Sequence, residues 1–410
     1  MRKLTVKNFS VIKDAELEFG KITVLIGPQS SGKSLLCKLA YFFSKEVLEI
    51  AEGRIRNEFS FPDFQDAVAK RFSEWFPASG WGHHAWALSY VSGDFEVSAS
   101  GHRGDASSIS IFNLAFGKRF EQEYFRLDSG SGAAARILAY LELSKLMERG
   151  IWQDATYIPS ERSYFVDIEK GYRLLASQSD PIANRFAEFY PKSLNPETTR
   201  NKLKASLQGE LLRGGESWLF SFVDGRVLPL NFLSTGSKEL LPLFCALETY
   251  SNTRRGIVLD EEIGPISDDS VRIDEFFVEE PEAHIFPKKQ YEIVQYFAEL
   301  LNNKDLRASF TITTHSPYIL TAFNSLIEAW RVGNKEGKRE QVAALIPERY
   351  WVNENDFAAY SIRDGKLESI FKKETDGEEG SGLIDGDFLD SVSDSLGSEF
   401  DKLLDIEYAD

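Results

Sequence analysis

The chain has 410 residues, of which 42% are hydrophobic, 27% are charged and only two are cysteine. This composition allows a sizeable core and excludes both wholesale disorder and a disulfide framework, and the length predicts two or three domains. No run approaches the roughly 20 apolar residues of a membrane helix, so we expect a soluble, cytoplasmic protein without a membrane partner. The net charge of −17 disfavours nucleic acid as the main partner.

The negative charge is concentrated in one segment. Residues 374–410 hold 13 acidic residues and one basic residue, a net charge of −12 that leaves −5 for the rest of the chain. Glycine and aspartate crowd residues 376–387, which predicts a flexible link. The segment is either a solvated tail or a surface for a basic partner.

The first fifty residues have the order strand, loop, helix. Apolar and charged residues alternate over residues 3–10 and 15–19, and the apolar run at 21–26 predicts a buried strand that ends at Gly27. Helical spacing follows over residues 35–43. In this arrangement the amides at the helix N-terminus form an anion site.

The middle of the chain has weaker patterns. Residues 84–112 alternate like hairpin strands, with Gly93 and Gly101 as expected turns, and residues 133–149 have helical spacing. We find no internal repeat and no long heptad array, which excludes the long coiled-coil arms of chromosome-maintenance ATPases.

Regular patterns return after residue 180. The expected elements are helices over 180–213 broken at Pro191 and Pro196, a loop at 234–238 before a helix to residue 250, strands at 276–278 and 309–313, a helix at 288–302, and strands at 358–362 and 367–371 joined by Asp364-Gly365.

Residues 27–34 read GPQSSGKS, a full match to the phosphate-binding pattern G-x-x-x-x-G-K-[ST]. The two glycines allow backbone angles that turn amides toward phosphates, the Lys33 ammonium is a point charge for the outer phosphates, and the Ser34 hydroxyl suits Mg²⁺. The expected nucleotide contacts are Gly27, Pro28, Gln29, Ser30, Ser31, Gly32, Lys33, Ser34 and Leu35.

Two later strands end in side chains that suit phosphate chemistry. Residues 276–286 read FFVEEPEAHIF, in which Glu279 would hold Mg²⁺ through water and Glu280 would polarise the attacking water. The strand before His315 would place that histidine where it can sense a γ-phosphate. Ser234 and Gly236 open a helix and offer a hydroxyl and an amide to a phosphate.

A second acidic segment competes with Glu279 and Glu280. Residues 256–262 read GIVLDEE, and Asp260 follows Ser234 by 26 residues, whereas Glu280 follows it by 46. Glu280, however, precedes His315 by only 35 residues and has the continuation Pro-Glu-Ala-His. We therefore favour Glu279 and Glu280, and interpret residues 256–274 as an acidic insertion.

Together these residues resemble ABC-type ATPases of the RecF and OLD (overcoming lysogenisation defect) kind, whose features occur here in the family's order. The resemblance covers residues 1–45 and 228–325. It is carried by the opening VKNF and the phosphate loop, by Ser234-Thr235-Gly236 as the signature loop, by Glu279 to His284 as the Walker B segment, and by Thr314 to Pro317 as the switch. Residues 158–162 (IPSER) also resemble a short Pro-x-Glu-Arg segment of such proteins.

The resemblance implies an α/β fold, an ABC-type head in which helices flank a mixed sheet, with an inserted α/β or mainly helical region. We expect the ATPase core at residues 1–50 and 228–330, the inserted region and lateral elements at 51–227, C-terminal strands completing the core at 331–373, and the acidic tail at 374–410.

The same resemblance implies hydrolysis of ATP with Mg²⁺, with Glu280 and His315 as catalytic residues and Ser34 and Glu279 at the metal. It implies a head-to-head dimer, or a higher oligomer, in which Ser234, Gly236 and Lys238 of one chain face the phosphate loop of the other. Only about 95 residues follow His315, too few for the nuclease domain of OLD enzymes. The chain thus resembles the stand-alone ATPase subunits of anti-phage systems, which control a separate effector such as a nuclease.

Two alternatives remain open at this stage. One is a RecF-like DNA-repair or DNA-binding ATPase, although no DNA contact is indicated. The other is a scaffold that binds ATP with little turnover, because Glu279 replaces the family's aspartate and Lys238 ends the signature.

Overall fold

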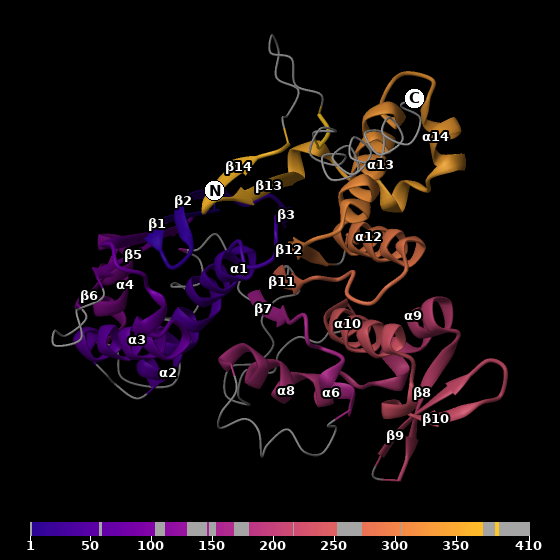
Figure 1. The fold of residues 1–410 in the computed structure, drawn as a ribbon, viewed down its shortest axis with the longest axis horizontal. Helices are drawn as coiled ribbons and strands as arrows, with labels where there is room; N and C mark the ends of the chain where they lie inside the picture. Colours follow the sequence, from indigo (N-terminus) through magenta and orange to yellow (C-terminus); the bar gives the residue numbers. More distant parts are fainter. Residues whose placement is uncertain are drawn as a thin grey trace, which may run out of the picture.

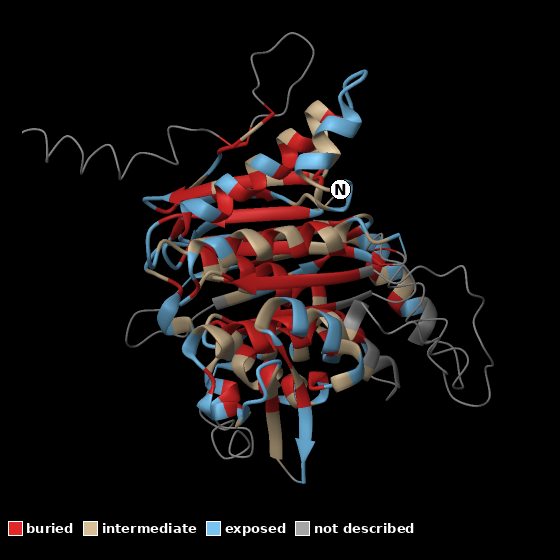
Figure 2. Ribbon diagram, turned by 90° about the vertical axis from the view of Figure 1, so that its right-hand side faces the viewer, coloured by how far each residue is buried: buried red, intermediate tan, exposed pale blue. Residues whose placement is uncertain are grey.

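The computed structural model describes residues 2–56, 60–102, 111–128, 146, 153–167, 180–215, 217–251, 273–304, 306–371 and 382–384. Within them an 11-stranded mixed sheet forms the middle layer, and helices cover both of its faces (Figures 1 and 2). This confirms the predicted α/β fold class, a mixed sheet with flanking helices. None of the described helices is long and apolar enough to cross a membrane.

The sheet has an antiparallel half and a mainly parallel half. In spatial order its strands are β6 (Ile111–Phe116), β5 (Phe95–His102), β4 (Trp86–Ser92), β1 (Arg2–Phe9), β2 (Ile12–Glu18), β14 (Lys366–Ser369), β13 (Phe357–Arg363), β3 (Ile22–Ile26), β12 (Arg307–Thr314), β11 (Ile273–Glu279) and β7 (Gln153–Ile158). From β13 to β7 every neighbouring pair is parallel. Parallel strands buried on both faces read as apolar runs, as β3 does.

Alternate residues of the parallel strands enter two separate cores. On one side, Leu25 and Phe277 pack with α1 (Lys33–Tyr41), a π-helical turn (Phe42–Glu46), α2 (Val47–Arg56), α3 (Phe61–Trp75) and α4 (Lys118–Asp128). On the other side, Val24 and Phe276 pack with α8 (Pro181–Ser193), α9 (Pro196–Leu207), α10 (Thr235–Ser251), α12 (Pro287–Leu301) and α13 (Pro317–Gly333). The sheet therefore supports helices on both faces.

Smaller elements complete the described fold. They are α6 (Tyr164–Asp167), α14 (Arg339–Leu345) and a three-stranded antiparallel sheet of β8 (Gly209–Gly214), β9 (Ser217–Phe222) and β10 (Val227–Pro229). Residues 51–227, expected as an inserted region, contribute four strands to the main sheet, namely β4 to β7. The segment from 331 to 373 contributes β13 and β14.

Several local expectations were wrong. Gly101 lies inside β5, paired with Trp86 and Phe112, so only Gly93 makes a turn. Pro191 lies inside α8 near its C-terminal end and does not break it, while Pro196 begins α9, as proline favours a first helical turn.

Two boundaries also differ from the sequence patterns. Residues 209–213 belong to strand β8, and the helix expected after residue 238 already begins at Thr235. Other predicted features lie outside the described residues: nearly all of the helix at 133–149, the acidic stretch with Asp260, and almost all of the tail.

Candidate functional site

The site forms where four adjacent parallel strands end at one edge of the sheet. The ladder pairs Ile26 of β3 with Thr314 of β12, Thr313 of β12 with Glu279 of β11, and Val278 of β11 with Ile158 of β7. The strands thus end level, and the segments after them meet. The carboxyl ends of parallel strands are where open α/β sheets bind ligands.

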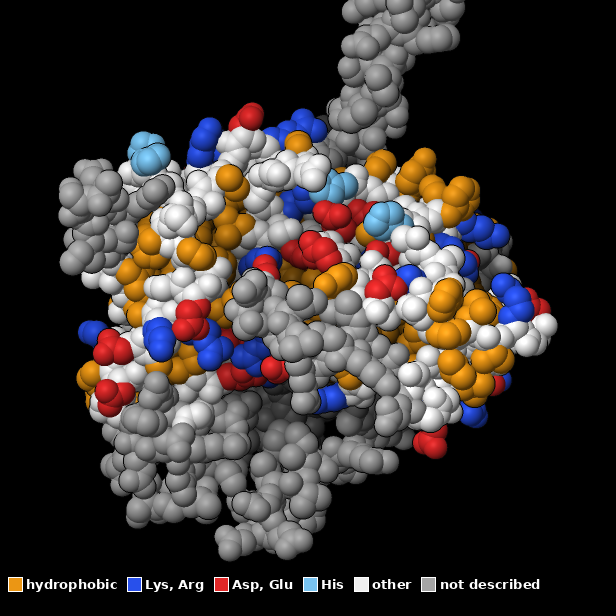
Figure 3. Space-filling view, turned by 60° about the horizontal axis from the view of Figure 1, so that its bottom comes forward, with side chains coloured by type: hydrophobic (Ala, Val, Ile, Leu, Met, Phe, Trp, Pro, Cys, Tyr) orange, Lys and Arg blue, Asp and Glu red, His pale blue; other side chains and the backbone are white. Residues whose placement is uncertain are grey.

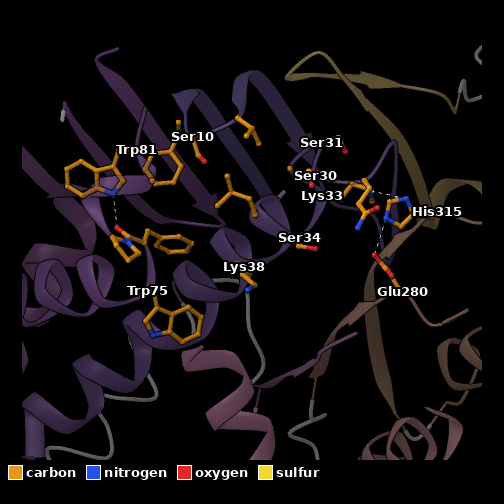
Figure 4. Close-up of a pocket in the computed structure, with 18 residues that line it drawn as sticks. Ser10, Ser30, Ser31, Lys33, Ser34, Lys38, Trp75, Trp81, Glu280 and His315 are labelled. Carbon is orange, nitrogen blue, oxygen red and sulfur yellow. Dashed lines mark hydrogen bonds and ion pairs between the residues drawn. The ribbon is translucent and has the colours of Figure 1, made fainter. Parts of the chain in front are cut away.

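A cavity of about 500 Å³ lies against the phosphate loop (Figure 4). Its lining includes residues 29–35 of the loop, the side chains of Lys38, Glu280 and His315, and at the other end the aromatic segment from Trp75 to Trp81. Trp81 is buried, and its indole N–H donates to the Phe76 carbonyl at 2.7 Å, yet both it and Trp75 also line this cavity.

Glycine is required at both ends of the loop for steric reasons. A Cβ at Gly27 would lie 2.5 Å from the Ile362 carbonyl oxygen, so the loop packs directly on β13. Gly32 has φ +105°, a backbone angle that other residues rarely adopt, and its missing side chain leaves room for Ile12. Both glycines hold the loop close to the sheet at the start of α1.

The Lys33 side chain lies within the loop and is nearly buried. Its Nζ donates to the Gly27 carbonyl at 2.9 Å and to the Pro28 carbonyl at 2.8 Å, and lies 3.5 Å from His315 Nδ1. Burial lowers the pKa of Lys33, and the charges of Glu280 and Glu282 oppose that shift. The ammonium is therefore held where a phosphate of a ligand in the cavity would be its strongest partner.

Glu280 and His315, the residues that follow β11 and β12, meet at the cavity (Figure 4). His315 Nε2 lies 3.0 Å from Glu280 Oε1, and both side chains are about one-third exposed, at 33% and 35%. If Lys33 donates to Nδ1, then Nε2 carries the proton and donates to Glu280. The Glu280 backbone has φ +41°, a rare conformation for a non-glycine residue and typical of functional sites.

Two residues that the sequence analysis did not assign hold the His315 segment. The Glu282 carboxylate accepts from the Thr314 hydroxyl and from the His315 amide, each at 2.7 Å. The Ser316 hydroxyl donates to Gln290 Oε1 at 2.6 Å. Glu282 belongs to the Pro-Glu-Ala-His run, so the sequence pattern could have indicated it as a functional residue. No sequence pattern indicated Gln290 on α12.

Glu279 is not among the residues that line the cavity. It is buried, and its carboxylate accepts from the Tyr157 hydroxyl at 2.7 Å and from the Ser160 amide at 3.4 Å. Burial raises the pKa of Tyr157 and of Cys37 beside it, so both stay neutral donors.

The donors fit Mg²⁺ unequally. The Ser34 hydroxyl belongs to the cavity lining together with Glu280, and hydroxyl and carboxylate oxygens suit this hard cation. Glu279 would act on the metal only through water or after leaving Tyr157. Within the described part of the chain, no three His, Cys, Asp or Glu side chains converge as a preformed metal site.

The signature residues lie apart from the cavity of their own chain, since Ser234, Gly236 and Lys238 are not among its lining residues. The Ser234 hydroxyl lies 2.9 Å from that of Ser237 and accepts from its amide, and Lys238 Nζ donates to Asp167 at 2.6 Å. A Cβ on Gly236 would lie 3.4 Å from the His284 carbonyl. The signature loop therefore adjoins the acidic turn, residues 279–284.

Comparison with known proteins adds one family match. Residues 161–320 match the family model described as "AAA ATPase domain", a stretch that holds Ser234, Glu280 and His315 and adjoins the phosphate loop in space. The chain carries a P-loop ATPase domain. None of the curated proteins matches it.

Solved structures similar to this ATPase include the SMC head domain from Thermotoga maritima, at 11% identity and TM-score 0.39 over 90% of this chain and 97% of that chain. An Smc head domain bound to the C-terminal domain of ScpA, derived from Pyrococcus furiosus, has 13% identity and TM-score 0.40 over 90% and 96%. The recombination mediator RecF has 12% identity and TM-score 0.35 over 90% and 97%. At these scores the likenesses carry no functional weight.

Proposed function

We propose that this ATPase is an ATP-driven dimeric switch that controls a separate effector protein, in defence against phage. One observation carries the proposal: Lys33, Glu280 and His315 meet at the cavity, while the signature loop lies outside it. A single chain therefore holds the groups for hydrolysis in its own cavity. Its signature residues can face the phosphate loop of a second chain.

Each group in the cavity has a chemical role in the proposal. The amides of residues 29–34 and the Lys33 ammonium hold the phosphates of ATP. The Glu280 carboxylate orients and deprotonates the attacking water, and His315 fixes that carboxylate through its Nε2 proton. Ser34, and through water Glu279, would hold Mg²⁺, which would neutralise charge on the outer phosphates.

Exposed aromatic side chains support self-association through the face that carries Ser234, Gly236 and Lys238. Phe232 precedes the signature loop and is 69% exposed, Phe286 follows the acidic turn and is 76% exposed, and Tyr318 follows His315 and is 56% exposed. Figure 3 shows acidic and histidine side chains gathered on one face with hydrophobic side chains beside them. A second copy would cover such residues, and exposed aromatic residues are typical of interfaces.

The effector and the phage role rest on the sequence resemblance. Stand-alone ATPases of this kind act on a partner. In this chain, the helices and strands outside the ATP-binding site provide surfaces to which such a partner could bind. ATP can drive the switch only if it binds the open and closed states differently, and phosphate contacts made only in the closed dimer provide that difference.

The test separates the steps. Light scattering should show a dimer of the Glu280→Gln variant with ATP and Mg²⁺ and a monomer without ATP, and Ser234→Arg should block dimer formation while leaving ATP bound. Arg339→Lys, at an exposed position on α14, is the control. Cells carrying the chain with its neighbouring genes should lower phage plating, and Lys33→Ala should abolish that effect. An ATP-independent oligomeric state would contradict the switch.

A scaffold with little turnover is the second candidate, and one observation favours it. The Glu279 carboxylate is bonded to Tyr157 and lies outside the cavity lining, so its help to Mg²⁺ is indirect. Steady-state phosphate release decides between the two: turnover that is saturable in ATP and lost in Lys33→Ala excludes the scaffold.

A further inference from the structure

Arg162 is one of the largest fully buried side chains among the described residues, with 0% exposure. It lies in the turn between β7 and α6, directly behind the acidic turn of β11. A buried guanidinium is costly unless its donors are all satisfied. Burial lowers the pKa of Arg162, and four glutamates, Glu239 foremost, oppose that shift.

The guanidinium donates to backbone carbonyls of three separate segments. Nη1 reaches the Glu279 carbonyl at 2.9 Å and that of Pro159 at 3.2 Å, and Nη2 reaches the Glu280 carbonyl at 3.1 Å. Nε donates to the Glu239 carbonyl at 3.1 Å and lies 3.4 Å from the Glu239 carboxylate. A planar fork of five donors can span such a set, whereas an ammonium cannot.

These contacts join the catalytic turn to the helix of the signature loop. Glu239 lies near the start of α10, one residue after Lys238, and its other carboxylate oxygen lies 3.3 Å from His284 Nδ1. The Lys238 bond to Asp167 of α6 ties the same helix start to the segment that carries Arg162. Within one chain, the Arg162 side chain thus links α10 to the Glu280 turn, beside the contact of Glu239 with His284.

We propose that Arg162 is a positioning residue that fixes the Glu280 backbone and couples it to the signature end of α10. Glu280 has a positive φ angle, a conformation that persists only when the surrounding structure holds it in place. Arg162 binds the Glu279 carbonyl before this residue and the carbonyl of Glu280 itself. A displacement of α10, where a second chain would bind, then moves Glu280 in the chain's own cavity. The inference rests on the proposed hydrolytic role of Glu280.

Arg162→Lys is the main test because it keeps the charge and loses the fork. We expect kcat to fall about tenfold or more, as for a small misplacement of a catalytic group, while the Kd for a fluorescent ATP analogue stays within about twofold. Adding Arg162→Lys to Glu280→Gln should cause no further loss, because both act on one group. Arg339→Lys, an exposed arginine paired with Glu348, is the matched control.

A readout independent of turnover keeps the two proposals apart. Hydrogen–deuterium exchange of Arg162→Lys should quicken at residues 279–284 and also at 235–239. Exchange confined to residues 159–163, or kcat within about twofold of the parent, would overturn the coupling. Absence of ATP hydrolysis in the parent chain would instead refute the proposed function, while exchange still decides the role of Arg162.

If Arg162→Lys loses cooperative unfolding, Glu239→Gln serves in its place, since it keeps all four carbonyl bonds and removes only the carboxylate. It should lower kcat by a smaller factor at unchanged ATP affinity, and quicken exchange at 235–239. Unchanged kcat together with unchanged exchange in that variant would count against the proposal.

Discussion

Replacing Glu280 by glutamine tests the catalytic site most directly. The substitution keeps the length and shape of the side chain, and the amide oxygen can still accept from His315 Nε2, now 3.0 Å from Oε1. What disappears is the negative charge and the ability to take a proton from water. The exposed position of the carboxylate, at 35%, makes a large change in folding stability unexpected.

The magnitude follows from the lost group. A positioned general base contributes at least about 10²-fold, which corresponds to about 2.7 kcal/mol of transition-state stabilisation. Phosphate release under single-turnover conditions should therefore slow by that factor or more, while binding of ATP, which depends on the phosphate loop, stays close to that of the parent.

Asp260→Asn is the matched comparison, because Asp260 is the acid of the competing segment. Its turnover should remain near that of the parent. If Glu280→Gln turns over ATP at the parent rate and Asp260→Asn does not, the acid that activates water lies in the segment of Asp260 and not after β11.

Three further changes follow from contacts in the structure. Lys33→Ala should abolish measurable ATP binding by calorimetry, because Lys38, the other lysine that lines the cavity, is bonded to Asp180; unchanged affinity and turnover together would reject the placement of the site. Tyr157→Phe removes the donor to the buried Glu279 carboxylate and should lower the free energy of unfolding in urea by about 1–3 kcal/mol, a loss that would be absent if the carboxylate were solvated. Lys202 lies 3.3 Å from the centroid of the Tyr296 ring, and burial lowers its pKa to about 8. The folded state disfavours the charged form of Lys202, so the free-energy cost of burying this charge is fully present below pH 8 and fades as the pH rises toward the ordinary lysine pKa. Lys202→Met should therefore stabilise the fold by about 1–3 kcal/mol at pH 7 and by less at pH 9.5. An equal gain at both pH values would contradict this.

Contiguous motifs made part of the site predictable. Residues 27–34 bring their own geometry, since a buried strand, two glycines and a helix start are local features, and the strands that end at Glu279 and Thr314 showed as apolar runs. The fold class followed from the family resemblance that these motifs carry. The hairpin predicted over residues 84–112 includes β4 and β5, but nothing local shows that these strands continue the sheet beside β1.

The remainder depends on partners far away in the chain. Tyr157 reaches Glu279 across 122 residues, and Arg162 reaches Glu239 across 77. The pairing of β7 with β11 brings the first pair together, and the packing of α6 against α10 brings the second. A short Pro-x-Glu-Arg motif gave no hint of four carbonyl bonds. Every residue has a backbone carbonyl, so the sequence does not show which carbonyls a buried arginine will bind.

The position of β7 explains why both Tyr157 and Arg162 lie beside the acidic turn. It is the last strand of the sheet and pairs in parallel with β11, so the segment that follows it passes directly behind the acidic turn. From there Tyr157 occupies one oxygen of Glu279, and Arg162 occupies the carbonyls of Glu279 and Glu280. One side of the acidic turn is thereby fixed by β7, and the other side is left to face the cavity. A glutamate in place of the shorter aspartate fits this arrangement, because its extra methylene lets the carboxylate reach Tyr157 while the backbone stays in register with β12.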